Sequence, residues 1–196
     1  MRSAWDHNIQ YHRVVLQSVP PNCRDALDVG CGEGLLARQL ATRCQRVTAI
    51  DLDTPVLLRA KASQPADARI AFLRGDVMTY PFGDSSFDLI SAVATLHHLP
   101  LRPALMRFRA LLKPRGMLAI VGLYRQHTIG DYAYAAAGLP ASWLLRRLHS
   151  FNEVHAPLRE PRETLREIRA VCDELLPGNV FRRHLLFRYS VVWQKP

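Results

Sequence analysis

Three acids in this chain each follow a short apolar stretch, and the first of them opens a glycine-rich loop. In the run ALDVGCGEGLLARQLA, Asp28 precedes Gly30, Gly32 and Gly34. Glycines allow a tight turn with positive φ and let a ligand approach the backbone without a Cβ in the way. The pattern predicts a strand before the loop and a helix after it. This is where open α/β sheets bind nucleotide-type ligands.

The charges around this loop indicate which ligand it can accept. A dinucleotide loop would carry a third glycine three positions after Gly32, where this chain has Leu35. Asp28 and Glu33 put carboxylates where a pyrophosphate would have to lie, and they would repel it. A ligand with an ammonium and a sulfonium group is favoured instead. The loop therefore points to S-adenosylmethionine (AdoMet).

Two further acids are suitably placed for the rest of such a ligand. Residues 46–51 (RVTAID) are expected to form a strand that ends in Asp51, whose carboxylate can accept from both ribose hydroxyls. Leu52 can then lie against the adenine face. Asp76, in LRGDVMTYPF, can accept from the adenine amino group beside the Val77 backbone. The alternative for Asp76 is a turn acid after a strand.

With the segments FDLISAVATLHHL and LLKPRGMLAIVGLY, these residues complete a pattern that resembles the class I AdoMet-dependent methyltransferases. The resemblance is to the small-molecule "methyltransferase domain" (type 11-like) family and covers residues 5–124 well. It implies an α/β fold with a doubly wound, mostly parallel, seven-stranded Rossmann-like sheet and a helical insertion after the fifth strand. It also implies AdoMet as the cofactor.

The segment after the fourth strand faces the substrate in such enzymes. Here it reads ATLHHLP and lacks the Asn/Asp-Pro-Pro-aromatic tetrad that marks methylation of amino groups on nucleobases or glutamine. His97 and His98 stand there instead, and one of them could accept a proton from an alcohol, phenol or enol. The alternative is that each histidine only hydrogen-bonds within the loop. Backbone contacts of Leu96 and His97 to the cofactor are also expected.

Two segments are expected to cover the site. Residues 1–24 are interpreted as a cofactor-covering helix, from which Tyr11 could reach the methionine end of AdoMet, or else as a solvated capping helix. Residues 125–160 are interpreted as a substrate lid, or as a patch that rests on a membrane surface or a partner. The expected cofactor-binding set is Tyr11, Asp28, Gly30, Cys31, Gly32, Asp51, Leu52, Asp76, Val77, Leu96 and His97.

Strands and helices alternate at the short spacing of a doubly wound sheet, and this alternation positions the site residues. Asp53 is interpreted as the cap of a helix with Pro55 near its start. Helices are expected at 6–18, 34–43, 55–63, 103–112, 130–150 and 161–176, and strands at 25–29, 46–51, 69–74, 87–93 and 117–123, with two more strands within 180–194.

The composition favours one cytoplasmic domain, residues 1–196. A chain of 196 residues with 48% hydrophobic content suits one sizeable core. Its four cysteines form no C-x-x-C pair and no cluster at metal spacing, so neither a metal site nor a disulfide framework is expected. No apolar run approaches the roughly 18 residues of a membrane span, and the N-terminus lacks the apolar core of a signal peptide.

The net charge of +9 raises the question of a nucleic-acid partner. Nearly all of it is arginine, scattered along the chain rather than gathered into one stripe, so nucleic acid is not the expected partner. The predicted function is methyl transfer from AdoMet to a small-molecule acceptor, at an oxygen or carbon nucleophile. A nucleic-acid-modifying methyltransferase, a non-catalytic AdoMet-binding or partner subunit and, more weakly, a nicotinamide-dependent dehydrogenase are the alternatives. The sequence leaves the oligomeric state open.

Overall fold

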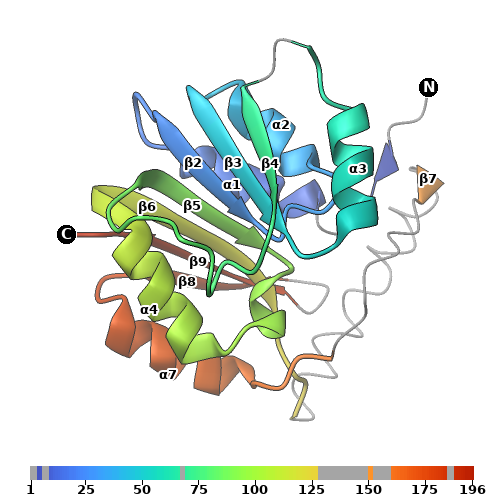
Figure 1. Ribbon diagram of the computed structural model, residues 1–196. Coiled ribbons are helices and arrows are strands. Elements are labelled where there is room, and N and C mark those ends of the chain that lie inside the picture. The colour runs from blue at the N-terminus through green and yellow to red at the C-terminus, as the bar shows by residue number, and fades with distance from the viewer. Residues whose placement is uncertain (1–3, 6–8, 67–68, 128–149, 152–159, 185–187) are drawn as a thin grey trace.

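The computed structural model describes residues 4–5, 9–66, 69–127, 150–151, 160–184 and 188–196. A seven-stranded sheet in the order β4-β3-β2-β5-β6-β9-β8 runs through the centre of this part of the chain (Figure 1). Its strands are β2 (Asp25–Val29), β3 (Arg46–Asp51), β4 (Ile70–Arg74), β5 (Phe87–Val93), β6 (Leu112–Leu123), β8 (Val180–His184) and β9 (Arg188–Gln194). Neighbours from β4 to β6 pair in parallel, whereas β9 is antiparallel to both β6 and β8. The predicted fold class is confirmed.

Helices cover both faces of the sheet (Figure 1). One apolar cluster joins a sheet face to α4 (Leu101–Leu111) and α7 (Leu165–Leu175). A second cluster joins the other face to α1 (His12–Gln17), α2 (Leu35–Ala41) and α3 (Thr54–Ala62). Because both faces are covered, the central strands read as nearly continuous apolar runs.

Short elements complete the described chain. A 3₁₀ turn, η1 (Ile9–Tyr11), precedes α1, and a second one, η2 (Leu96–His98), follows β5. Two-residue strands β1 (Ala4–Trp5) and β7 (Ser150–Phe151) pair in parallel. The expected helix at 130–150 and most of the interpreted lid at 125–160 lie outside the described residues.

Three predicted starts differ most from the structure, and the other described boundaries agree to within two residues. The helix expected from residue 161 begins at Leu165, because Thr164 caps it: the Thr164 hydroxyl accepts from the Glu167 backbone N–H at 3.3 Å, and Glu167 Oε2 accepts from the Thr164 N–H at 2.7 Å. The strand expected at 117–123 begins at Leu112, with an irregular register near its start. The helix expected at 6–18 is described only from Ile9 and starts as the 3₁₀ turn.

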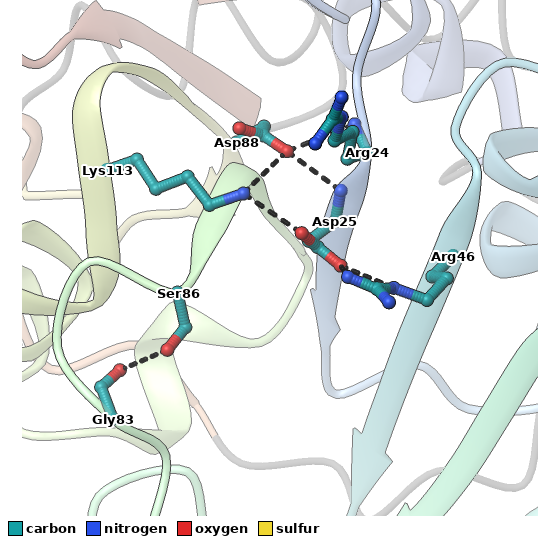
Figure 2. Close-up of polar contacts among 7 residues, drawn as sticks. All are labelled: Arg24, Asp25, Arg46, Gly83, Ser86, Asp88 and Lys113. Carbon is teal, nitrogen blue, oxygen red and sulfur yellow. Dashed lines mark hydrogen bonds and ion pairs between the residues drawn. The ribbon is translucent and has the colours of Figure 1, made fainter.

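Charged side chains from four strands contact one another at the amino edge of the sheet (Figure 2). Lys113 Nζ lies 2.9 Å from Asp25 Oδ2 and 3.0 Å from Asp88 Oδ2. Arg46 pairs with the other oxygen of Asp25 at 2.6 Å. Burial alone would raise the pKa of Asp25, but the hydrogen bonds from Lys113 and Arg46 outweigh it and lower the pKa.

Replacing Lys113 with methionine should lower the free energy of unfolding by about 1–3 kcal/mol at pH 7, because it leaves two part-buried carboxylates facing each other. Since the folded-state pKa of Asp25 is depressed, the contribution of this network is complete above its ordinary value of 3.8 and is lost as the pH falls below it. Urea titrations at pH 7 and pH 3 measure both effects. Arg46→Met is the matched control, since that side chain is 73% exposed and should cost no more than about 0.5 kcal/mol. Equal losses for the two variants would contradict this interpretation.

Candidate active site

The glycine loop leaves β2 in a conformation that depends on its glycines. Gly30, Gly32 and Gly34 have φ values of 66°, 53° and 73°. The Gly30 N–H donates to the Ile50 carbonyl at 2.8 Å, which ties the loop to the end of β3. A Cβ on Gly30 would overlap with the Thr95 side chain, whereas a Cβ on Gly32 would meet open space. Gly32 therefore presents backbone to a volume that a ligand can enter.

Asp51 holds this loop from the end of β3. Its Oδ2 accepts from the Gly32 N–H at 2.9 Å, and its Oδ1 accepts from the Asp53 N–H at 3.0 Å. Each carboxylate oxygen has a second lone pair, so the group retains the capacity to accept from two ligand hydroxyls. Leu52 beside it is 65% exposed, which leaves an apolar surface next to the carboxylate. Asp53 caps α3 through the Val56 N–H at 3.1 Å, as predicted.

Asp76 follows β4 and shapes the turn after it. Its Oδ1 accepts from the Met78 N–H at 2.9 Å, and its carbonyl accepts from the Tyr80 N–H at 2.7 Å. The Val77 side chain between them is buried. Asp76 therefore stabilises the turn after β4. Its second carboxylate oxygen can accept a hydrogen bond from an amino group.

Asp28 has the most unusual environment of the three acids. Its side chain is 2% exposed, and its Oδ1 accepts from the Ser91 hydroxyl at 2.7 Å. Oδ2 is buried and has no hydrogen-bond partner among the described residues. Burial raises the pKa of Asp28 to about 7, and the charge of Asp51 adds to the rise while the Ser91 hydrogen bond opposes it. A cationic donor at Oδ2 would satisfy this oxygen and favour the charged carboxylate, so the residue fits an ammonium group.

Cys31 lies between these acids. Burial raises the pKa of its thiol, and the charges of Asp28 and Asp51 raise it further. The thiol is therefore protonated at neutral pH and is a poor nucleophile. Any contact of Cys31 with the cofactor is therefore expected from its backbone. The Cys31 N–H donates to the Ile50 carbonyl at 3.2 Å.

The end of β5 brings the two histidines to the same edge as the loop. Ala94 has a φ of 53° and its N–H donates to the Val121 carbonyl at 2.7 Å, which fixes the chain as it leaves the strand. Leu96 is 2% exposed, so only its backbone can reach a ligand. The rings of His97 and His98 lie 4.1 Å apart, and both residues are half-buried. Their role in proton transfer stays a prediction.

Tyr11 lies at another part of this edge. Its side chain is 7% exposed and its ring centroid is 5.2 Å from that of His184, at the end of β8. The next residue, His12, contacts Gln39 of α2 through Nδ1 and Oε1 at 2.9 Å, so this segment runs between the hairpin and α2. Whether Tyr11 reaches the methionine end of the cofactor stays a prediction.

Sequence reasoning missed two groups of residues near the site. Ser91 donates a hydrogen bond to Asp28. The sequence signal for this contact is a polar residue inside the apolar run FDLISAV, because a buried polar group needs a hydrogen-bond partner. The second group lies where β6, β8 and β9 meet. The Arg183 Nε donates to the Tyr124 hydroxyl at 3.0 Å, and the next residue, His184, pairs with Arg188 on the opposite face of the sheet. No local pattern marks this second group, because it forms only when the hairpin is placed.

The described residues include no group of three or more His, Cys, Asp or Glu side chains that could hold a metal ion. Within the same residues, no helix is both long and apolar enough to cross a membrane. The four cysteines are free thiols.

Comparison with known proteins agrees with this geometry. The family model "Methyltransferase domain" matches residues 27–120, which run from β2 through the glycine loop to β6. An uncharacterized methyltransferase of Mycobacterium tuberculosis is 37% identical over 198 residues, covering the whole of both chains. The chain belongs to the class I AdoMet-dependent methyltransferases.

Two other proteins, one similar in sequence and one similar in structure, also resemble this methyltransferase. A 27-O-demethylrifamycin SV methyltransferase of Amycolatopsis mediterranei is 37% identical over 99 residues, or 48% of this chain and 36% of that protein. The crystal structure of the N-methyltransferase NodS from Bradyrhizobium japonicum, in complex with S-adenosylhomocysteine, has the same fold. Its TM-score is 0.65 at 18% identity, over 97% of this chain and 86% of NodS. The cofactor of this methyltransferase is AdoMet.

Proposed function

We propose that this methyltransferase transfers the methyl group of AdoMet to a small molecule, at an oxygen or carbon nucleophile. AdoMet supplies a methyl group on a positively charged sulfur, from which a nucleophile displaces it in line. The observation that carries the assignment of the site is the buried Oδ2 of Asp28, which has no hydrogen-bond partner among the described residues and fits a cationic donor. A cytoplasmic location stays a prediction of the sequence.

Each of the three acids then binds one part of the cofactor. Asp28 accepts from the amino group and Asp51 accepts from the ribose hydroxyls. The exposed Leu52 packs against adenine, while Asp76 and the Val77 backbone bind its amino edge. The backbone of Gly30, Cys31, Gly32, Leu96 and His97, together with the Tyr11 ring, completes the proposed set of cofactor contacts.

The proposal of an oxygen or carbon acceptor rests on the residues after β5. His97 and His98 are half-buried there, and one of them accepts the proton that an attacking hydroxyl or enol releases. No strong base is required, because orienting the acceptor and excluding water can supply most of the rate. The relative named for 27-O-demethylrifamycin SV is by its name a small-molecule enzyme, which supports this acceptor class.

The test follows labelled methyl groups into different kinds of molecule. The protein is incubated with AdoMet that carries tritium in its methyl group and with a cell extract separated into small molecules, RNA, DNA and protein. We expect label in the small-molecule fraction. Label in RNA or DNA would indicate the nucleic-acid-modifying alternative. Tight AdoMet binding without transfer to any fraction would indicate a non-catalytic subunit.

A further inference from the structure

Two cysteines lie side by side at the amino edge of the sheet. Cys23 is two residues before β2, and Cys44 is two residues before β3. Asp25 at the start of β2 pairs with Arg46 at the start of β3. The pairing continues back along both segments, because the Gln45 N–H donates to the Cys23 carbonyl at 3.1 Å. Cys23 therefore lies beside Cys44.

The side chains of these two residues also interact. Both are buried in the apolar cluster that joins α1, α2 and α3 to the sheet, with Cys23 2% and Cys44 6% exposed. Their thiols share a hydrogen bond, which Cys23 donates to Cys44. Neighbouring strands lie about 4.8 Å apart, and protein disulfides join Cα atoms that are about 4.4–6.8 Å apart. The two backbone segments are therefore spaced for a bond between the two sulfurs.

The hydrogen bond makes one thiol of the pair the better nucleophile. It lowers the pKa of Cys44 and outweighs burial and a nearby carboxylate, with a further lowering from the charge of Arg43. The same bond and burial raise the pKa of Cys23. Burial also raises the pKa of the other two cysteines, Cys31 and Cys172. Since the thiolate is the reactive form, Cys44 is the cysteine expected to react first with an oxidant.

A cavity gives small molecules access to the pair. Cys23 lines a cavity of about 350 Å³ at the amino edge of the sheet. Exposed residues that include Pro21, Asn22 and Arg115 form part of its lining, so the cavity opens to solvent. Its volume is several times the roughly 30 Å³ that a water molecule occupies in the liquid. Hydrogen peroxide, which is little larger than water, can therefore approach the two sulfurs although both side chains are buried.

We propose that Cys23 and Cys44 are a site of reversible oxidation, at which a peroxide converts the two thiols into an intramolecular disulfide. The Cys44 thiolate attacks hydrogen peroxide and becomes a sulfenic acid as the O–O bond breaks, and the hydroxide that leaves takes up a proton to form water. The Cys23 sulfur then attacks the Cys44 sulfur. The S–S bond forms, the S–O bond breaks, and the Cys23 proton leaves with the hydroxide as a second water. Two thiols are oxidised and one peroxide is reduced to two waters.

This disulfide would link the two ends of the segment that carries the glycine loop. Residues 23–44 contain β2, the loop with Asp28 and Gly32, and α2. A cross-link across a segment of this length restricts the unfolded chain and stabilises the folded one. The cysteines precede β2 whereas the glycine loop follows it, so the assigned cofactor contacts should not change. The inference therefore goes beyond the proposed function and does not rest on it.

The test maps the disulfides of the protein after treatment with hydrogen peroxide. Remaining thiols are blocked with N-ethylmaleimide in denaturant, and the chain is digested with trypsin. Each cysteine falls in a different tryptic peptide, so its partner can be identified by mass. We expect residues 14–24 to be linked to residues 44–46, and the link to disappear with dithiothreitol. Oxidation should raise the melting temperature by about 5 °C or more and change the affinity for S-adenosylhomocysteine no more than about twofold.

Two variants separate this pair from the other thiols. Cys44→Ala should lose both the linked peptide and the rise in melting temperature. Cys172→Ala removes another buried cysteine, on α7, and should keep both. Unlinked Cys23 and Cys44 after peroxide treatment, or a link from either of them to Cys31, would overturn the proposal. A melting temperature that falls on oxidation would also contradict it, because the native backbone would then not accommodate the bond.

Discussion

Replacing Asp51 with alanine should weaken the binding of AdoMet and S-adenosylhomocysteine at least about a hundredfold. The change removes an ionised acceptor from two ribose hydroxyls, and hydrogen bonds to charged groups contribute about 1.5–3 kcal/mol each. It also releases the Gly32 N–H, which donates to Asp51 Oδ2 at 2.9 Å, so the loop loses a contact that shapes it. Isothermal titration calorimetry with S-adenosylhomocysteine measures the loss.

Asp53→Ala is the matched control, two residues away in the same turn. It removes the cap of α3 and should cost about 1 kcal/mol of stability. The affinity for S-adenosylhomocysteine should change no more than about twofold, because the assigned ribose ligand is intact. If Asp53→Ala lost cofactor binding and Asp51→Ala kept it, the assignment of the two acids would be wrong.

The second large effect concerns the pH dependence of cofactor binding through Asp28. The pKa of this buried carboxyl is raised to about 7, and only its ionised form pairs with the amino group of AdoMet. The affinity should therefore fall about tenfold for each pH unit below 7, since one proton must be released on binding. Asp28→Asn should bind weakly at every pH and lose this slope. A slope that persists in the variant would show that another group is responsible.

Stability gives an independent measurement on the same residue. Because the folded-state pKa of Asp28 lies above its ordinary value of 3.8, the folded protein binds a proton more tightly than the unfolded chain between these values. The contribution of this group to the free energy of unfolding therefore falls as the pH rises from 3.8 to about 7. Without ligand at pH 8, Asp28→Asn should be more stable than the unaltered protein, by up to about 4 kcal/mol. Ser91→Ala removes a hydrogen bond that favours the ionised form and should move the midpoint of the binding profile to higher pH.

The three acids of the site could be predicted because their placement depends on local sequence. The strands expected at 25–29, 46–51 and 87–93 match β2, β3 and β5 residue for residue, since each is a short apolar run with clear polar ends. In a doubly wound sheet the carboxyl ends of such strands lie at one edge. The alternation of strands and helices was therefore enough to predict that Asp28 and Asp51 lie at the same edge. In the structure, Gly32 also contacts Asp51 through the hydrogen bond from its backbone N–H.

The residues that meet at the ends of β6, β8 and β9 could not be predicted, because their contacts join distant segments. Arg188 becomes a neighbour of Leu123 and His184 only through the register of an antiparallel hairpin whose turn the sequence does not mark. Tyr11 was assigned to the cofactor as part of a covering N-terminal helix, and that assignment stays a prediction. Its ring contact with His184 depends on the placement of the hairpin, which the sequence does not mark. Thr164 shows the same limit on a smaller scale: Pro161 suggested an earlier helix start, but the Thr164–Glu167 capping box fixes the helix at Leu165.

The central claim is that three acids at three strand ends hold AdoMet, with Asp28 on its amino group. A crystal structure of the protein with S-adenosylhomocysteine tests this most directly, because that product keeps the amino group, the ribose and the adenine. The account predicts the amino nitrogen within hydrogen-bond distance of Asp28 Oδ2 and both ribose hydroxyls on Asp51. A ligand whose amino group lies away from Asp28, or whose ribose does not contact Asp51, would contradict it.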